Sequence, residues 1–199
     1  AALGVDLPIG TPTGNMIICL GAGTSQAAVI SMSSIVSAET IRVAGLKLDE
    51  AIINYVRKKY GLIIGQPTAE QLKLNIGAAS PVQEEKTMEI QAQDQVSGLP
   101  KPASLTTNEI VEALQPPLEE IVASIRRVLE KTPPELISDI IDRGVALCGG
   151  TSLLKGLDKY LTVALGIPAY VVENPVTCTV EGAAKGFSIL EVLLRSQGR

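Results

Sequence analysis

The sequence contains no histidine among its 199 residues. Without an imidazole side chain, neither a Ser-His-Asp nor a Cys-His nucleophilic site can form, and metal centres with histidine ligands are excluded too. Any chemistry must use carboxylates, lysines, hydroxyls, backbone groups or a bound ion. Cysteine is almost as scarce. Cys19, Cys148 and Cys178 are too few and too widely spaced for a secreted disulfide framework, and they form no CxxC pair, so a reducing cytoplasm is the expected location.

Positive charge is not in excess, because the formal net charge is −4 and the Lys and Arg residues are scattered along the chain. Nucleic acid is therefore not an expected partner. The segment from Leu7 to Ala38 carries no charge, but prolines and glycines interrupt it repeatedly. Buried strands explain this segment better than a membrane span does, and the N-terminus has no basic-then-apolar signal sequence, so direct membrane insertion is not expected.

Apolar runs and helical periodicities predict the secondary structure of the first half of the chain. Three apolar runs follow one another and predict an antiparallel meander: Met16–Leu20, Ala27–Met32 and Ile35–Val43. Helical spacing then predicts a helix from Leu46 to Tyr60, in which Asp49 and Glu50 would occupy the first turn and complement the helix dipole. A second helix is predicted from Pro67 to Gly77.

The second half begins with a polar, proline-containing region from Ala79 to Ser104, in which the alternating stretch Thr87–Gln93 suits an edge strand. Thr107-Asn108 is predicted to cap a long amphipathic helix, and Pro116-Pro117 would kink or divide it. The remaining predicted elements are a helix from Pro133 to Gly144, a strand over Val145–Cys148, a helix over Ser152–Leu165, a strand over Ala169–Val172 and a closing helix over Thr179–Leu194.

Two glycine turns open directly out of apolar strands. The first, Gly21-Ala22-Gly23-Thr24, follows Met16–Leu20, and the second, Gly149-Gly150-Thr151-Ser152, follows Val145–Cys148. Paired turns of this kind bring backbone N–H groups to phosphate and nucleoside without side chains in the way, as several nucleotide-binding folds do.

Seven segments in order carry a resemblance to a known family: Pro12–Met16, Cys19–Thr24, Ile41–Gly45, Asp49–Ile53, Thr68–Glu70, Lys131–Leu136 and Gly149–Leu157. Together they resemble MreB, the family of bacterial actins of rod-shaped cells, and the resemblance covers essentially the whole chain. It is a resemblance to the C-terminal half of a complete bacterial actin, so the first ATPase lobe and its phosphate loop are expected to be absent.

The resemblance implies an α/β fold, an actin-like ATPase lobe with a ribonuclease-H-like mixed sheet, flanking helices and a small inserted α+β subdomain. Residues 1–45 and 107–199 would form the two parts of the sheet subdomain, and residues 46–106 the inserted one. It also implies a cytoskeletal protein that determines cell shape through nucleotide-dependent filaments. Its partners would be further actin-like subunits and a membrane-anchored adaptor of the shape-determining machinery.

The implied cofactor is ATP or ADP. By resemblance, Gly21, Ala22, Gly23 and Thr24 would form the second phosphate loop. Glu70 and Lys73, three residues apart on one helix face, would approach the adenosine. Gly149, Gly150, Thr151 and Ser152 would complete the adenosine side, with the N-terminus of the following helix adding partial positive charge.

The first turn departs from the family pattern. The usual Asp-Ile-Gly-Gly-Gly-Thr is replaced by Cys19-Leu20-Gly21-Ala22-Gly23-Thr24, so Mg²⁺ loses an expected partner, and the methyl group of Ala22 would penalise a positive φ. No metal ligands or catalytic residues are assigned, and the chain alone is not expected to hydrolyse ATP. The alternative is a nucleotide-blind remnant or scaffold that acts as a protein-interaction module.

Structural interpretations compete with several of these assignments. Glu70 and Lys73 could form a solvated helix pair, and Gly149-Gly150 could be only a tight turn that packs a helix onto the sheet. Arg126-Arg127 and Arg57–Lys59 are predicted to be solvated helix faces. Cys19 and Cys148 would lie side by side in an actin-like sheet, either as small apolar strand residues or close enough to pair under oxidation or to bind a soft metal.

Overall fold

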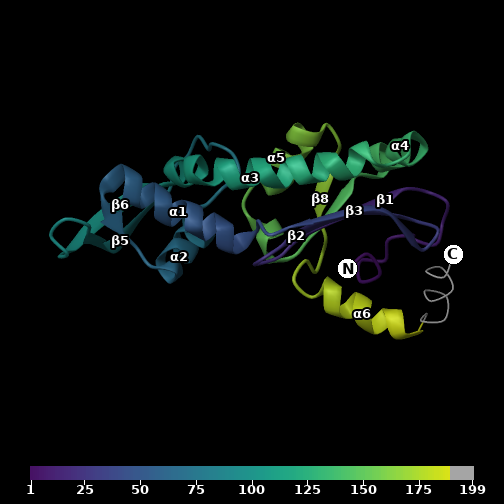
Figure 1. Ribbon diagram of the computed structural model, residues 1–199, viewed down its shortest axis with the longest axis horizontal. Helices are drawn as coiled ribbons and strands as arrows, with labels where there is room; N and C mark the ends of the chain where they lie inside the picture. The colour runs from purple at the N-terminus through teal and green to yellow at the C-terminus, as the bar shows by residue number, and fades with distance from the viewer. Residues whose placement is uncertain (189–199) are drawn as a thin grey trace.

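The structure is a computed structural model that describes residues 1–188. A five-stranded mixed sheet has the strand order β3-β2-β1-β7-β8 (Figure 1). Its strands are β1 (Asn15–Leu20), β2 (Ser25–Ser31), β3 (Ser34–Ile41), β7 (Val145–Cys148) and β8 (Ala169–Val171). The antiparallel meander predicted from the sequence is confirmed, and β1, β7 and β8 run parallel to one another.

The two faces of β1 contribute to two separate apolar clusters, because successive side chains of a strand point to opposite sides. Met16, Ile18 and Leu20 belong to the main core. Ile17 and Cys19 belong to a second, smaller cluster on the opposite face. Both faces of the sheet are therefore packed, as expected for a sheet with helices on either side.

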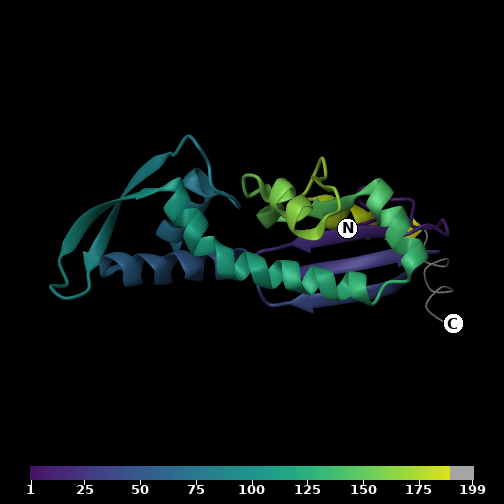
Figure 2. The same ribbon diagram turned by 90° about the horizontal axis from the view of Figure 1, so that it is seen from above.

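Helices cover both faces of the sheet (Figures 1 and 2). On one face lie α3 (Thr107–Glu130), α4 (Pro134–Arg143) and α5 (Leu157–Leu165), and on the other lies α6 (Cys178–Ser188), beside the N-terminal segment. The predicted continuation of α6 to Leu194 lies outside the described residues. Among the helices of residues 1–188, none is long and apolar enough to cross a membrane.

The long helix α3 is not divided at Pro116-Pro117, because both prolines lie inside one continuous helix of 24 residues. Figure 2 shows it bending in its N-terminal part, as prolines inside a helix predict. Its first turn is closed by a capping box in which Thr106 accepts from the Glu109 backbone N–H and Glu109 accepts from the Thr106 N–H.

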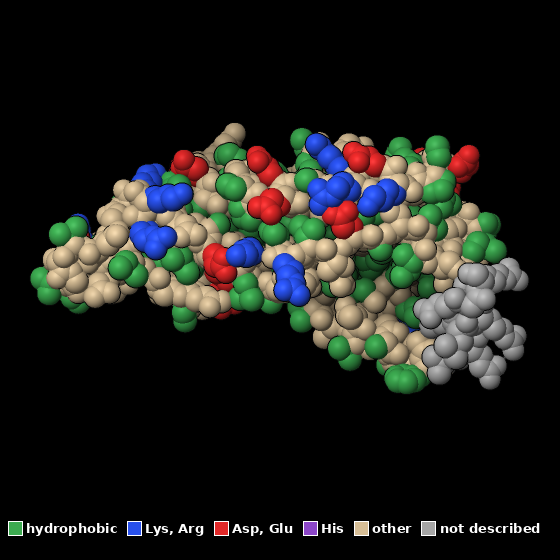
Figure 3. All heavy atoms as spheres, viewed as in Figure 1, with side chains coloured by type: hydrophobic (Ala, Val, Ile, Leu, Met, Phe, Trp, Pro, Cys, Tyr) green, Lys and Arg blue, Asp and Glu red, His purple; other side chains and the backbone are tan. Residues whose placement is uncertain are grey.

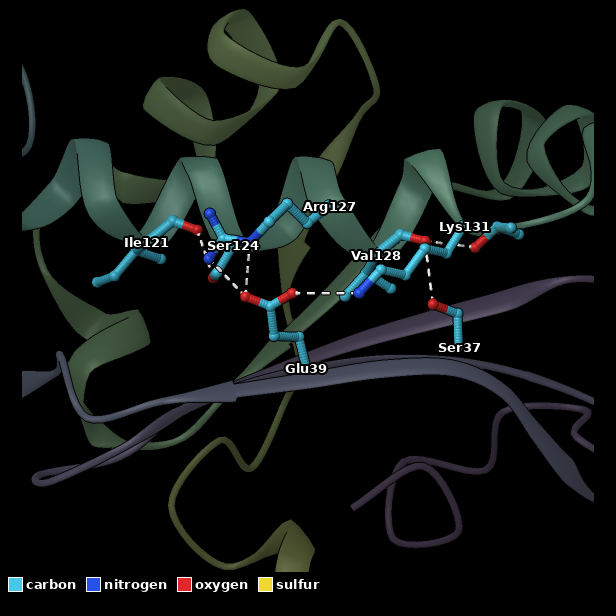
Figure 4. Close-up of polar contacts among 8 residues, drawn as sticks. Ser37, Glu39, Ile121, Ser124, Arg127, Val128 and Lys131 are labelled. Carbon is cyan, nitrogen blue, oxygen red and sulfur yellow. Dashed lines mark hydrogen bonds and ion pairs between the residues drawn. The ribbon is translucent and has the colours of Figure 1, made fainter.

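Polar contacts fasten α3 to strand β3 (Figure 4). The Ser37 hydroxyl donates to the Val128 carbonyl at 3.2 Å. Glu39 accepts from the Arg127 guanidinium at 2.8 Å through Nε, and Lys131 lies 4.0 Å from the same carboxylate. Arg127 therefore connects α3 to β3, whereas the sequence predicted only a solvated helix face for it. The Arg127 hydrogen bond holds the pKa of Glu39 below its usual value.

Beyond these contacts, the helix surfaces carry charge of both signs. In Figure 3, Lys and Arg side chains alternate with Asp and Glu over α1 and α3. No basic stripe forms on the face shown there, in agreement with the scattered positive charge of the sequence.

A second, three-stranded sheet has the order β4-β5-β6. Its strands are β4 (Leu62–Ile63), β5 (Thr87–Asp94) and β6 (Pro100–Thr106), and α1 (Gly45–Tyr60) and α2 (Gln66–Ile76) pack beside it. The stretch Thr87–Gln93, predicted as an edge strand, lies in β5, which pairs with β6 along its length and with the two-residue β4 only at Gln93 and Asp94. The prediction therefore holds for Thr87–Ala92 and fails at the end of the strand. Strand β6 forms the opposite edge of this sheet, where Pro100 and Pro102 are tolerated since an outer edge needs no N–H donor.

Two predicted helix starts also need correction. The helix expected from Ser152 is a short 3₁₀ turn, η1 (Gly150–Leu153), followed by α5, which begins only at Leu157 after Gly156 with a φ of 74°. The first long helix begins at Gly45, so Asp49 and Glu50 lie beyond its first turn. No α-helix N-terminus therefore lies at Ser152 to add positive charge there. Asp49 does not complement the dipole of α1 but forms an ion pair with Lys73.

Candidate functional site

The first glycine turn closes the β1–β2 hairpin. The Gly21 N–H donates to the Thr24 carbonyl at 3.0 Å. The φ angle of Ala22 is not positive, so its methyl group causes no backbone strain. The expectation that this methyl group would be penalised was wrong. Nothing lies within 4 Å of a Cβ placed on Gly23. This loop therefore tolerates side chains better than its glycine content indicates.

The carbonyls of this loop cap helix α1. Gly45 N–H donates to the Gly21 carbonyl at 3.2 Å, and Leu46 N–H donates to the Ala22 carbonyl at 2.8 Å. Helix α1 has no side-chain cap, so these two carbonyls satisfy N–H groups that would otherwise lack partners. A Cβ at Gly45 would lie 2.9 Å from the Thr151 Oγ1, which makes this a position of close approach.

The second glycine turn packs against the end of β1. Gly149 has a φ of 86°, and a Cβ there would lie 2.2 Å from the Leu20 carbonyl oxygen. Its N–H donates to the Pro175 carbonyl at 2.6 Å. The buried Ser152 hydroxyl donates back to the Gly149 carbonyl at 2.7 Å. Gly149 and Ser152 thus have packing roles inside the turn.

Thr151 joins the two turns. Its hydroxyl donates to the Gly21 carbonyl at 2.8 Å. Because Gly21 also accepts from Gly45, the two turns and the start of α1 form one hydrogen-bonded unit. The sequence placed these turns far apart in the chain, and the parallel pairing of β1 with β7 brings them together.

Lys73 forms a buried ion pair with Asp49. The Lys73 Nζ lies 2.7 Å from Asp49 Oδ1, and the side chains are 12% and 3% exposed. Lys73 also donates to the Gly45 carbonyl at 3.2 Å. Burial raises the pKa of Asp49, and the Lys73 ammonium opposes that effect. Glu70 lies exposed on the same helix, and Lys73 pairs with Asp49. The alternative in which Glu70 and Lys73 form a solvated pair was therefore wrong for Lys73.

Beside this ion pair, a cavity of about 250 Å³ opens between α2 and η1. Its lining residues are Leu48, Lys73, Leu74, Asn75, Gly77, Lys86, Gly150, Thr151, Leu153, Leu154 and Lys155. The Ala79 N–H donates to the Lys155 carbonyl at 2.9 Å and holds the two sides together. The lining contains three lysines and no carboxylate. Lys73 is already paired with Asp49, so Lys86 and Lys155 are the charges that favour an anionic ligand.

The structure brings together some of the residues that the sequence singled out. Lys73, Gly150 and Thr151 line the cavity, and Gly21 and Ala22 adjoin it through Thr151 and α1. Gly23, Thr24 and Glu70 are exposed and do not line it.

Sequence reasoning missed Lys86, Lys155 and the partner of Lys73. No local pattern marks these residues, because each belongs to a different segment and they meet only in the folded chain.

The residues beside the first turn do not fit a magnesium ion. Mg²⁺ prefers carboxylate and other oxygen ligands, whereas Cys19 offers sulfur. Asp49 is the nearby buried carboxylate, and it is already paired with Lys73. The Gly21 and Ala22 carbonyls accept hydrogen bonds from α1 and Thr151. No step of the chemistry is therefore assigned to a magnesium ion held here.

Comparison with known proteins agrees with this architecture. The sequence profile of the MreB/Mbl protein family matches residues 1–194. The chain belongs to the MreB/Mbl family. MreB of Escherichia coli (strain K12), a cell shape-determining protein, is 44% identical over 192 residues, which are 96% of this chain and 55% of that protein. Mbl of Bacillus subtilis (strain 168), also a cell shape-determining protein, is 43% identical over 182 residues, which are 92% of this chain and 55% of that protein.

Two solved structures have the same fold. MreB5 of Spiroplasma citri bound to ADP superposes with a TM-score of 0.91 at 36% identity, over 98% of this chain and 59% of that one. The MamK double helical filament gives a TM-score of 0.76 at 21% identity over 94% of this chain and 57% of that one, which supports the actin-like fold alone. The chain thus spans little more than half the length of its MreB/Mbl relatives.

Proposed function

We propose that this chain forms the C-terminal, nucleotide-binding lobe of an MreB-type protein that determines cell shape, and that the cavity between α2 and η1 binds adenosine nucleotide. The observation that carries the proposal is the lining of this cavity, which combines several leucines with Lys86 and Lys155 and contains no carboxylate. Structures of MreB5 from Spiroplasma citri bound to ADP and to AMPPNP support the same ligand class.

The physical fit has two parts. Leu74 and Leu153 present apolar surface at the cavity, where 66% and 60% of their area is exposed, and such surface suits the flat face of a base. Lys86 and Lys155 are exposed ammonium groups that would attract phosphate oxygens. The exposed Gly150 lets a ligand approach the backbone closely, since no side chain stands in the way.

Hydrolysis is not part of the proposed function of this chain alone. The first turn carries Cys19 where the family pattern has an acidic residue, and phosphoryl transfer depends on positioning and charge neutralisation. We propose that the lobe serves as part of a filament subunit, which self-associates with further actin-like subunits. Contact with a membrane-anchored adaptor stays a prediction from family resemblance.

Calorimetric titration with ADP tests the nucleotide proposal. Saturable heat is expected, and removal of magnesium should leave the affinity unchanged, because no magnesium ligand is assigned at the first turn. The Lys155→Ala variant should bind ADP about tenfold more weakly through loss of a charged hydrogen bond. Lys101→Ala is the matched control, since Lys101 pairs with Asp94 on the β5–β6 hairpin and does not line the cavity.

Two results would contradict the proposal. Absence of heat at millimolar ADP would favour the nucleotide-blind scaffold. If Lys155→Ala and Lys101→Ala weaken the affinity for ADP equally, the binding depends on the general charge of the surface and not on this cavity.

A further inference from the structure

All three cysteines lie on the same side of the main sheet, on the face away from α3. Cys19 on β1 and Cys148 on β7 are directly paired in the parallel register, and Cys178 begins α6, which covers this face. They belong to one apolar cluster, in which Cys148 and Cys178 are fully buried and Cys19 is partly buried. All three are free thiols.

The pairing of Cys19 with Cys148 has the separation that a disulfide needs. Neighbouring strands lie about 4.8 Å apart, and residues in register on parallel strands direct their side chains to the same face. A disulfide requires Cα atoms about 4.4–6.8 Å apart. The two residues therefore meet the distance requirement without backbone movement.

Cys19 is also the more accessible thiol of the pair. A cavity of about 280 Å³ opens on this face of the sheet, and Cys19, Ile17 and Ala28 are among the residues that line it. A small oxidant can therefore reach Cys19, whereas Cys148 lies behind it. The cavity lining holds no Asp, Glu, Lys or Arg side chain that would compete for a proton.

The electrostatics of the pair distinguish its two members. The Cys148 thiol donates a hydrogen bond to Cys19. This hydrogen bond, against the cost of burial and with help from the Thr179 hydroxyl, lowers the pKa of Cys19 to about 6. The same hydrogen bond, together with burial, raises the pKa of Cys148. Cys19 is thus the nucleophile, because the thiolate is the reactive form.

We propose that Cys19 and Cys148 form a redox-sensitive thiol pair, in which a hydroperoxide oxidises Cys19 and Cys148 closes a disulfide across the ends of β1 and β7. The Cys19 thiolate attacks one peroxide oxygen, so that an S–O bond forms, the O–O bond breaks, and the leaving oxygen takes a proton. The sulfur of Cys148 then attacks the sulfur of the Cys19 sulfenic acid. An S–S bond forms, the S–O bond breaks, and hydroxide leaves with the Cys148 proton as water. Two thiols lose two electrons, and one hydroperoxide is reduced.

Metal binding by the three thiols is the competing use of this cluster. Within residues 1–188, no group of three or more Cys, Asp or Glu side chains is arranged to hold a metal ion. Cys178 also forms a hydrogen bond with Cys148, and its own thiol donates to the Pro175 carbonyl at 3.6 Å, but it is not in strand register with Cys148 as Cys19 is. The geometry therefore favours chemistry of the Cys19–Cys148 pair.

A disulfide here would act close to both glycine turns. Only Leu20 separates Cys19 from Gly21, and Cys148 directly precedes Gly149. The bond would fix the two turns at their present separation. Any effect on ADP affinity rests on the proposed function, whereas formation of the disulfide does not.

Peptide mapping tests the proposal on the full chain. Trypsin separates the three cysteines, because Cys19 lies in the peptide of residues 1–42, Cys148 in 144–155 and Cys178 in 160–185. After treatment with hydrogen peroxide and alkylation of free thiols, the expected product is peptide 1–42 linked to peptide 144–155. It should form at equal yield in Cys178→Ser and disappear on reduction. In Cys148→Ser, Cys19 should stop at a sulfenic acid that dimedone labels.

Three outcomes would overturn the proposal. In the first, all three cysteine peptides remain alkylated after peroxide treatment. In the second, the disulfide involves peptide 160–185 instead. In the third, the disulfide forms only between two copies of the chain. Because the wild-type protein supplies the main readout, a folding defect in either variant would not obscure the result.

Discussion

The Thr151 hydroxyl donates to the Gly21 carbonyl at 2.8 Å, and this hydrogen bond joins the two glycine turns. It connects residues that are far apart in the sequence but lie at the ends of two paired strands, β1 and β7. Gly21 also accepts from Gly45, so the bond links the turns to the start of α1 as well. The wall of the proposed nucleotide cavity depends on this unit.

Replacing Thr151 by valine keeps the shape of the side chain and removes the donor. We expect a loss of about 1 kcal/mol of unfolding free energy, or about 3 °C in Tm for a chain of this size, together with weaker ADP binding. Thermal denaturation checks the stability. Thr151→Ser retains the hydroxyl and is the control, so an equal loss in both variants would contradict the role of the hydrogen bond.

Gly45 and Gly23 give a matched test of close approach. A Cβ at Gly45 would lie 2.9 Å from Thr151 Oγ1, whereas a Cβ at Gly23 meets nothing within 4 Å. Gly45→Ala should lower the unfolding free energy by about 1–3 kcal/mol because the turns must shift. Gly23→Ala should leave it unchanged or slightly higher. Chemical denaturation separates the two, and equal effects would show that the turns are not closely packed.

The buried pair of Asp49 and Lys73 should be strongly coupled. Asp49→Asn or Lys73→Met alone leaves a buried charge or polar group without its partner and should cost about 3 kcal/mol. The double variant should cost less than the sum of the two. Lys47→Met is the control on α1, because Lys47 and Glu50 form a solvent-exposed pair and should matter little. Additive single effects at Asp49 and Lys73 would refute the coupling.

The reactivity of Cys19 should depend on pH in a defined window. Its pKa is lowered from 9.0 to about 6, chiefly by the Cys148 thiol. The thiolate is therefore populated above pH 6, and the rate of alkylation at Cys19 should fall about tenfold per pH unit below it. Mass spectrometry of peptide 1–42 measures this rate. A rate that still rises between pH 8 and 9 would mean that the thiol is unperturbed.

Local patterns predicted the elements whose side chains repeat regularly. The meander and the approximate start of α3 follow from alternation and helical spacing. The cap predicted at Thr107-Asn108 was one residue too late, because Thr106 caps the helix together with Glu109. The sequence did not reveal strand β6, because Pro100 and Pro102 in it are typical of a loop. It did not reveal the break before α5 either, since the left-handed Gly156 lies inside a helix-like apolar pattern.

The candidate site was predictable only in part, for a physical reason. Glycine turns have a local signature, and the two turns do meet through Thr151 and Gly21. Lys86 and Lys155 have no such signature, because exposed lysines are common on helices and loops. The sequence predicted that Asp49 complements the dipole of α1. Its ion pair with Lys73 could not be predicted, because it depends on how α1 packs against α2.

Amide chemical-shift mapping with ADP tests the central claim most directly. If the cavity between α2 and η1 binds the nucleotide, saturable shifts should appear at Gly150, Thr151, Lys155 and Leu74, which line it. They should be weakened in Lys155→Ala. Absence of shifts at millimolar ADP, or shifts confined to the separate cavity of about 370 Å³ beside α6, would contradict the proposal.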